Sequence, residues 1–365
     1  MSITTDRDTL AITVDSYKAH VGNGLLERAG EIIRTVAPAH RYAIISDDNV
    51  APLYASRLRA SLGGASAELY TIPPGEPFKT REQWARLTDA LLAAGFGRDT
   101  TILALGGGVI GDLAGFVAAT YMRGIPFVQL PTTLLAMIDA SIGGKTGVDT
   151  AAGKNLVGAF HQPRAVIADA SVLATLPANH LRSGLAEAIK HGAIADAQYY
   201  GSIDGMLPSI LDRRGTELQE LIARSIEIKA SIVRQDEREG GIRRNLNFGH
   251  TIGHAIESDS GYSLLHGEAI AIGMVLEAKL GESLGVTAPG TVARLRDTLR
   301  KAGLPVTTPK SLVANRILAA TRSDKKAREG VVEYALIAEI GRAIAGIRAP
   351  DETVLQVLTQ DTNSQ

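Results

Sequence analysis

Three of the eight histidines lie between residues 250 and 266, and they are the strongest chemical signal in the sequence. His250 and His254 are four residues apart, so on a helix their side chains lie on the same face. Such a pair can hold a divalent ion, or provide one metal ligand and one proton-transfer group. An isolated pair at this spacing is more often a pair of hydrogen-bonded core or surface histidines. The interpretation therefore depends on what accompanies the histidines.

Charged and amide side chains beside glycines, or inside apolar helical stretches, accompany the histidines. They are Lys145, Lys154, Asn155, Glu187, Lys190, Lys229, Glu239, Arg243 and Asn247. Any one of them alone would usually be a solvated surface group. Together with a metal, they suit a substrate that carries carboxylate, phosphate and vicinal hydroxyl groups.

A glycine-rich run, Leu105–Asp112, follows one predicted strand and begins a helical stretch. Glycines at this junction let the backbone approach a pyrophosphate, whose charge is met by free N–H groups at the helix start. The spacing differs from the GxGxxG fingerprint, so a tight turn without a ligand is the alternative. Asp47–Asn49 and Thr132–Thr133 add polar groups at two other strand ends. Since ligands of open α/β sheets bind at the carboxyl ends of strands, these three places together predict a dinucleotide site.

The elements that must position these groups differ between the two halves of the chain. Short apolar runs at 42–46, 101–105, 126–130 and 165–168 are typical of buried parallel strands. Helical spacing occurs between them, with an apolar stripe of Trp84, Leu87, Leu91 and Leu92 in the stretch 80–95. Alternation of this kind predicts a doubly wound α/β sheet.

Long helical patterns dominate after residue 177, as at 218–234 and 269–284, with one exception at 331–347 that predicts a small hairpin. We therefore expect an α/β, Rossmann-like nucleotide-binding domain over residues 1–178. A mostly α-helical metal- and substrate-binding domain is expected over residues 179–365.

Composition narrows the class of protein. At 365 residues the chain exceeds the size at which one core keeps growing, so two domains are expected. A net charge of −1 gives no overall field for nucleic acid or an anionic membrane. Because there is no cysteine, a metal must bind to histidine and carboxylate. The polar start and the lack of an apolar run of about 20 residues predict a cytoplasmic protein without a signal peptide or spanning helix.

Several long stretches resemble one family, the 3-dehydroquinate synthases, within the sugar-phosphate cyclases. The most specific are Gly106–Phe116, Gln129–Val148, Lys154–Asn155, Ser183–Lys190 and Leu246–His254. The resemblance runs in order from Asp47 to Lys326. It implies a dehydroquinate synthase-like fold with a nucleotide-binding and a helical domain.

The resemblance also implies roles for individual residues. It places a divalent metal, zinc or alternatively cobalt, on Glu187, His250 and His266, and makes His254 a second-sphere or proton-transfer residue. The residues that it implies for NAD are Asp47, Asn49, Glu76, Lys79, Gly107, Gly108, Val109, Asp112, Thr132, Thr133, Lys145, Lys154, Val172 and Thr175. Without the resemblance, Glu76 and Lys79 would be assigned to an ordinary solvated turn. The residues that it implies for substrate are Asp139, Lys145, Asn155, Lys190, Lys229, Glu239, Arg243, Asn247, His254 and either Lys325 or Lys326.

The activity that the resemblance implies is conversion of 3-deoxy-D-arabino-heptulosonate 7-phosphate to 3-dehydroquinate and phosphate, a step of the shikimate pathway. NAD would oxidise an alcohol transiently, phosphate would leave by β-elimination, and re-reduction, ring opening and an internal aldol reaction would follow. A homodimer is implied, and neither nucleic acid nor a membrane is an expected partner. The alternatives are another sugar-phosphate cyclase, a metal- and NAD-dependent polyol dehydrogenase of the glycerol dehydrogenase type, or a non-catalytic NAD-sensing module.

Overall fold

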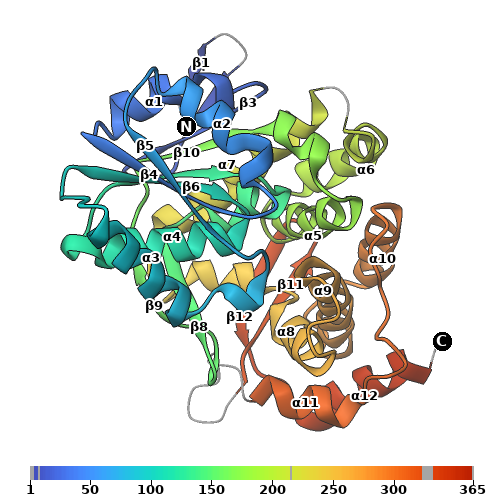
Figure 1. Ribbon diagram of the computed structural model, residues 1–365. Coiled ribbons are helices and arrows are strands. Elements are labelled where there is room, and N and C mark those ends of the chain that lie inside the picture. Colours follow the sequence, from blue (N-terminus) through green and yellow to red (C-terminus); the bar gives the residue numbers. More distant parts are fainter. Residues whose placement is uncertain (1–3, 7–8, 214–215, 323–331, 364–365) are drawn as a thin grey trace. The chain divides into compact units, whose positions relative to one another are not determined.

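The chain folds into two compact units, Met1–Leu176 and Pro177–Gln365, which divide close to the boundary expected after residue 178. The structure is a computed structural model that describes residues 4–6, 9–213, 216–322 and 332–363 (Figure 1). Lys325 and Lys326 lie outside the described residues.

An eight-stranded sheet organises the first unit, with the strand order β1-β2-β3-β10-β7-β6-β4-β5. Its strands are β1 (Thr4–Asp6), β2 (Thr9–Thr13), β3 (Lys18–Gly22), β4 (Arg41–Asp47), β5 (Ala67–Ile72), β6 (Thr100–Gly106), β7 (Phe127–Pro131) and β10 (Ala165–Asp169). The six strands from β3 to β5 run parallel, and β1 and β2 extend the sheet antiparallel. Every residue of β6 is buried, as a central parallel strand covered on both faces requires. The predicted doubly wound sheet is confirmed.

Helices cover both faces of this sheet (Figure 1). They are α1 (Ala29–Val36), α2 (Ala51–Ser61), α3 (Arg81–Ala93) and α4 (Gly108–Thr120). Ala43 and Ile45 of β4 pack with the side chains of α3 and α4. Because successive side chains of a strand alternate between faces, Ile44 points to the opposite face, where α2 lies against β4. A two-stranded hairpin, β8 (Lys145–Thr150) and β9 (Gly153–Phe160), packs against α4.

The stripe predicted for α3 is wrong at one position. Leu87 and Leu91 are fully buried and Trp84 packs against the same core, whereas Leu92 is 53% exposed. Positions 84, 87 and 91 follow the helical spacing, and residue 92 lies about 100° further round the helix than residue 91.

The second unit is mostly helical, as predicted. Its helices are α5 (Ala178–Ala195), α6 (Ala197–Leu211), α7 (Glu217–Gln235), α8 (His250–Asp259), α9 (His266–Ser283), α10 (Thr291–Lys301), α11 (Ala314–Arg322) and α12 (Asp351–Asn363). The predicted hairpin is confirmed as β11 (Tyr334–Glu339) and β12 (Arg342–Ile347). Helix α9 is central, with α5, α8, α10 and α12 packed around it. Its buried residues lie on all sides, which is expected for a helix that is enclosed by others.

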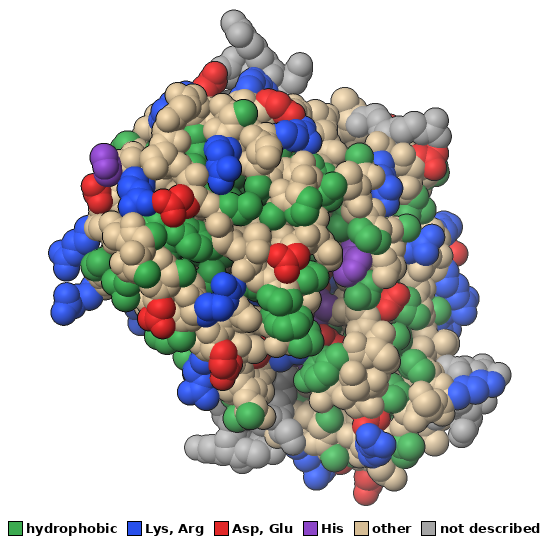
Figure 2. Space-filling view, viewed as in Figure 1, with side chains coloured by type: hydrophobic (Ala, Val, Ile, Leu, Met, Phe, Trp, Pro, Cys, Tyr) green, Lys and Arg blue, Asp and Glu red, His purple; other side chains and the backbone are tan. Residues whose placement is uncertain are grey.

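Charges of both signs are mixed on the face of the protein shown in Figure 2, in keeping with the near-zero net charge. Within the described residues, none of the helices combines the length and the apolar character that crossing a membrane requires.

Candidate active site

Four predicted side chains of the second unit converge at the starts of α8 and α9. The imidazole nitrogens of His250, His254 and His266 include a set that lies within 4.8 Å of one another. Glu187 of α5 brings its Oε1 to 3.5 Å from His250 Nε2 and 3.7 Å from His266 Nε2. The Glu187 side chain is fully buried. A buried carboxylate facing imidazole nitrogens fits a divalent cation, and nitrogen and oxygen donors without thiolate fit zinc or cobalt.

Glycines allow the helices that carry this cluster to approach closely. A Cβ on Gly267 would lie 2.1 Å from the Ser183 carbonyl oxygen, and the Gly267 N–H donates to Ser183 Oγ at 3.0 Å. Ser183 lies one turn before Glu187, so this contact fixes the start of α9 beside the carboxylate. A Cβ on Gly273 would lie 2.0 Å from the Gly249 carbonyl oxygen, which brings α9 against the start of α8 in the same way.

Glu277 holds the first turn of α8 from within the core. Its carboxylate accepts hydrogen bonds from the N–H groups of Gly249 at 2.6 Å and Ile252 at 3.0 Å, and the residue is fully buried. A carboxylate at a helix N-terminus satisfies donors that have no partner within the helix and interacts favourably with the helix dipole. Glu277 was not predicted from the sequence. The available signal was a single acid inside an otherwise apolar run, Ala269–Ala278.

Charge within the cluster is balanced by close pairs. Lys190 contacts the Glu187 carboxylate from the next turn of α5, and both side chains are buried. His266 Nδ1 lies 3.1 Å from Glu257 Oε2. Desolvation disfavours protonation of His266, but hydrogen bonds and charge from Glu187 and Glu257 outweigh it and raise the pKa of His266 to about 9. The two carboxylates therefore favour positive charge at His266.

Besides Lys190 and His254, the predicted substrate residues in the described part of the second unit lie on α7 and on the segment that leads into α8. Lys229 is buried on α7. Asn247 Nδ2 donates to Glu239 Oε1 at 2.8 Å, so the segment before His250 folds back on itself. Asp236 fixes this fold, because its carboxylate accepts the N–H groups of Gly240, Gly241 and Arg243. Arg243 is only 2% exposed.

A second group of predicted residues meets around Lys79 in the first unit. Lys79 Nζ lies 2.9 Å from Glu76 Oε1, 2.9 Å from Asn155 Oδ1 and 3.4 Å from Asp112 Oδ2. Lys154 Nζ lies 3.8 Å from the same Glu76 oxygen. The structure therefore brings together five residues from three separate segments.

Asp149 joins this group and was not predicted. Its Oδ1 lies 3.6 Å from Lys79 Nζ and accepts the Asn155 N–H at 2.8 Å. No spacing rule points to it, since only the pairing of β8 with β9 brings it to Asn155. Desolvation raises the pKa of Asp112 to about 6, against the opposing charge of Lys79. The same neighbouring carboxylates outweigh the desolvation of Lys79 and raise its pKa.

The predicted strand ends also lie together in the first unit. The ends of β6 and β7 are adjacent, since the Thr132 N–H donates to Gly106 O at 2.9 Å and a Cβ on Gly107 would lie 3.1 Å from Thr133 Cγ2. Gly107 provides no side-chain cap to α4, so Gly108 and Val109 begin a helix with free N–H groups.

Other predicted residues already have structural partners or stand at element ends. Asp47 Oδ1 accepts the N–H groups of Asn49 and Val50, each at 2.9 Å, and so closes the turn into α2. Tyr54 of α2 donates to the Val172 carbonyl at 2.8 Å and lies 2.6 Å from Thr175 Oγ1. Asp139 lies in the helical turn Ala136–Ala140, and Lys145 begins β8.

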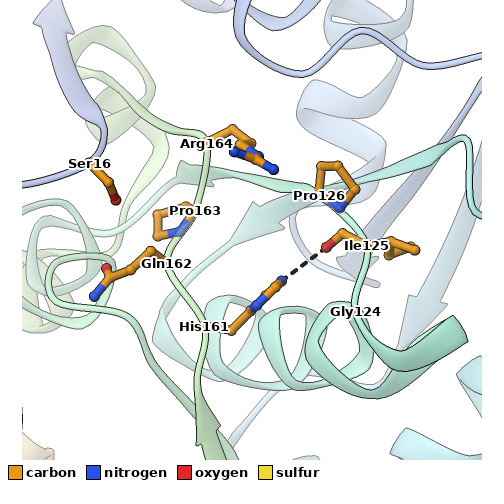
Figure 3. A pocket seen from close by; sticks show the side chains of 8 residues that line it. All are labelled: Ser16, Gly124, Ile125, Pro126, His161, Gln162, Pro163 and Arg164. Atoms are coloured by element: carbon orange, nitrogen blue, oxygen red, sulfur yellow. Dashed lines mark hydrogen bonds between the residues drawn. The ribbon is translucent and has the colours of Figure 1, made fainter.

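A cavity elsewhere in the first unit contains none of the predicted site residues. It lies between the segments 124–126 and 161–164 and also contacts Ser16 (Figure 3). His161 is the side chain there with catalytic potential. Its Nε2 lies 2.9 Å from the Ile125 carbonyl oxygen, and its ring stacks on Phe127 with centroids 5.3 Å apart. Those contacts give His161 a structural role.

Comparison with known proteins identifies the family of the chain. Residues 69–183 match the family description 3-dehydroquinate synthase N-terminal, and residues 184–327 match 3-dehydroquinate synthase C-terminal. The chain belongs to the 3-dehydroquinate synthase family. Within that family, the 3-dehydroquinate synthase of Rhodospirillum rubrum is 45% identical over 360 residues, covering 96% of this chain and 93% of the relative. The 3-dehydroquinate synthase of Nitrosomonas europaea is 44% identical, covering 94% of each chain.

Solved structures of sugar-phosphate cyclases share the whole fold of this 3-dehydroquinate synthase family member. A 2-deoxy-scyllo-inosose synthase in complex with carbaglucose-6-phosphate, NAD⁺ and Co²⁺ is similar with a TM-score of 0.88 and 26% identity, over 97% of this chain and all of that one. The 2-epi-5-epi-valiolone synthase of Streptomyces hygroscopicus, with NAD⁺ and Zn²⁺, has a TM-score of 0.87 and 31% identity, over 97% and 99%. A probable glycerol dehydrogenase from Sinorhizobium meliloti, at 16% identity and a TM-score of 0.66 over 94% and 95%, shares the fold alone.

Proposed function

We propose that the chain converts 3-deoxy-D-arabino-heptulosonate 7-phosphate to 3-dehydroquinate and phosphate, as a carbon–oxygen lyase that uses NAD catalytically and a divalent metal. One observation carries the proposal: in a member of this family, a buried Glu187 carboxylate faces His250 and His266 across 3.5 and 3.7 Å. NAD⁺ with Co²⁺ or Zn²⁺ in the two similar cyclase structures supports the choice of cofactors.

In this proposal Glu187, His250 and His266 hold the metal. When bound, the ion polarises a substrate hydroxyl and NAD accepts and returns the hydride. Lys190, in contact with Glu187, adds positive charge beside the reacting oxygen. His254, whose ring centroid lies 5.1 Å from that of His250, moves a proton at the same place.

Cationic and amide side chains that are buried or hydrogen-bonded bind the anionic substrate in this proposal. In the second unit, Lys229, Arg243 and Asn247 are assigned to the phosphate and carboxylate of the substrate. Lys229 and Arg243 are buried and Asn247 is held by a hydrogen bond, so these side chains lose little conformational freedom when the substrate binds. Glu239 orients Asn247 through its 2.8 Å hydrogen bond. Asp139, Lys145, Asn155 and one lysine of the pair Lys325 and Lys326 complete the proposed substrate set.

NAD is assigned to the strand ends of the first unit. The free N–H groups of Gly108 and Val109 at the start of α4 suit its pyrophosphate, and Gly107 lies directly before them. The group around Lys79 offers carboxylate and amide acceptors for hydroxyls, namely Glu76, Asp112 and Asn155. The remaining proposed contacts are Asp47, Asn49, Thr132, Thr133, Lys145, Lys154, Val172 and Thr175. The domain roles follow: residues 1–178 bind NAD, and residues 179–365 bind metal and most of the substrate.

The deciding assay is phosphate release from the heptulosonate phosphate, with and without NAD and a chelator. We expect release that requires both cofactors and leaves no net NADH. A heptulose phosphate without the carboxylate should react poorly, which separates this function from that of other cyclases. Net NADH formation with glycerol, and no phosphate release, would instead identify a polyol dehydrogenase.

A homodimer in the cytoplasm completes the proposal. Leu156 and Phe160 are 46% and 50% exposed on β9, and their even spacing places both on one face of the strand. An apolar face of this kind supports association with a second copy. Sedimentation at micromolar concentration is expected to give twice the mass of 38.5 kDa, and a single-chain mass would contradict the dimer.

A further inference from the structure

Glu257 stands beside the metal cluster and was not among the predicted site residues. It lies on α8 three residues after His254 and seven after His250, so all three side chains share one helix face. Its Oε2 lies 3.1 Å from His266 Nδ1, and its side chain is only 10% exposed. Because water has little access to the carboxylate, its charge acts on the imidazole with little screening.

This contact decides which nitrogen of His266 is available to a metal. An imidazole has two nitrogens, and a partner on one of them fixes the tautomer and the ring orientation. With Nδ1 facing Glu257, Nε2 faces Glu187 Oε1 at 3.7 Å. The ring is therefore held with its ligand nitrogen directed into the cluster.

His250 is held differently, which gives an internal comparison. Its Nδ1 lies 3.1 Å from the backbone carbonyl oxygen of Phe248, a neutral acceptor. A carboxylate acceptor makes the opposite nitrogen a stronger donor than a carbonyl does. The two imidazoles thus differ in the charge of the group behind them.

We propose that Glu257 is a positioning residue of the metal centre, which accepts the Nδ1–H of His266 and so directs and strengthens Nε2 as a metal ligand. The inference rests on the proposed metal site. It predicts that Glu257 affects metal binding only through His266. A carboxylate that merely ties α8 to α9 would change stability and leave the metal unaffected.

The test measures the Kd for Zn²⁺ of the metal-free full chain by competition with a chromophoric chelator, and the visible absorption of its Co²⁺ form. E257A removes the acceptor, and E257Q keeps the shape and removes the charge. We expect zinc binding to weaken by about 10–100-fold in E257A and by less in E257Q, with shifted cobalt bands in both. Wild-type affinity and spectrum in folded E257A would overturn the inference. If E257A does not fold, wild-type zinc affinity and a wild-type cobalt spectrum in E257Q would overturn the inference.

Two further variants separate the possible causes. E282Q removes a carboxylate from the far end of α9, where it accepts the Val292 N–H at 3.1 Å, and should lower stability without changing zinc affinity. In a double-mutant cycle, E257A should add nothing to the loss caused by H266A. Unchanged zinc affinity in H266A would reject the metal site itself, whereas a loss in H266A with none in E257A would reject only the role of Glu257.

Discussion

A buried carboxylate and a buried amine lie in contact on α5, where Glu187 and Lys190 are three residues apart. In the absence of metal, Lys190 is the nearest charge that compensates Glu187, and His266 lies further away at 3.7 Å; an uncompensated buried charge is strongly destabilising. A bound divalent ion would provide a second source of compensation for Glu187. The pair therefore links stability to metal content.

Substitution of Lys190 by alanine tests that link. In the metal-free chain we expect K190A to lower the free energy of unfolding by up to about 3–5 kcal/mol, since Glu187 then loses its nearest cation and keeps only the more distant His266. Saturating zinc should recover part of this loss, while phosphate release should be abolished. Denaturant titrations with zinc or with chelator measure both effects. An equal loss of stability with and without zinc would contradict the link, and full turnover in K190A would remove Lys190 from the site.

Asp112 gives the first unit a pH dependence whose sign can be worked out. Its pKa rises from 3.8 unfolded to about 6 folded, chiefly through desolvation. The folded state therefore binds the proton more tightly, so this contribution to stability is fully present below about pH 4 and is lost as the pH rises through about 6. D112N removes the titrating group. We expect it to flatten the change in stability between these pH values by up to about 3 kcal/mol, at about 1.4 kcal/mol per pKa unit. Thermal unfolding of both proteins across pH 4–7 measures it, and parallel profiles would contradict the assignment.

At the scale of elements, close contacts between helices determine where the metal ligands lie. In G267A a Cβ would meet the Ser183 carbonyl at 2.1 Å, so α9 must move away from α5 and carry His266 from Glu187. We expect a loss of about 1–3 kcal/mol in stability and weaker zinc binding. Gly205 of α6 provides the matched control, because a Cβ there meets nothing within 4 Å. G205A should leave zinc affinity unchanged and raise stability by up to about 1 kcal/mol. Wild-type zinc binding in G267A would show that this contact does not set the ligand geometry.

The same contacts explain what sequence could and could not predict. Parallel strands and the helical second half follow from apolar runs and periodicity, which are local properties. The prediction that Leu92 belongs to the buried stripe was wrong, because a residue directly after Leu91 fits a helical apolar stripe only loosely. Asp149, Glu257 and Glu277 were missed for a different reason. Each contacts a residue of another element that is nine or more residues away along the chain, and a single acid in a sequence does not identify such a partner.

At the scale of the whole molecule, each compact unit has its own core and its own proposed ligand. A ligand at a hundred times its Kd stabilises the folded state it binds by about 2.7 kcal/mol. Zinc should therefore slow amide hydrogen exchange in α5 and at the starts of α8 and α9. NAD should slow the exchange in residues 76–79, 106–112 and 149–155. Mass spectrometry of peptides from the full chain reads both patterns in one experiment. H250A provides the control, since it should lose the zinc pattern and keep the NAD pattern. Zinc protection confined to residues 1–176 would contradict the assignment of the metal to the helical unit, and NAD protection confined to residues 177–365 would contradict that of the nucleotide.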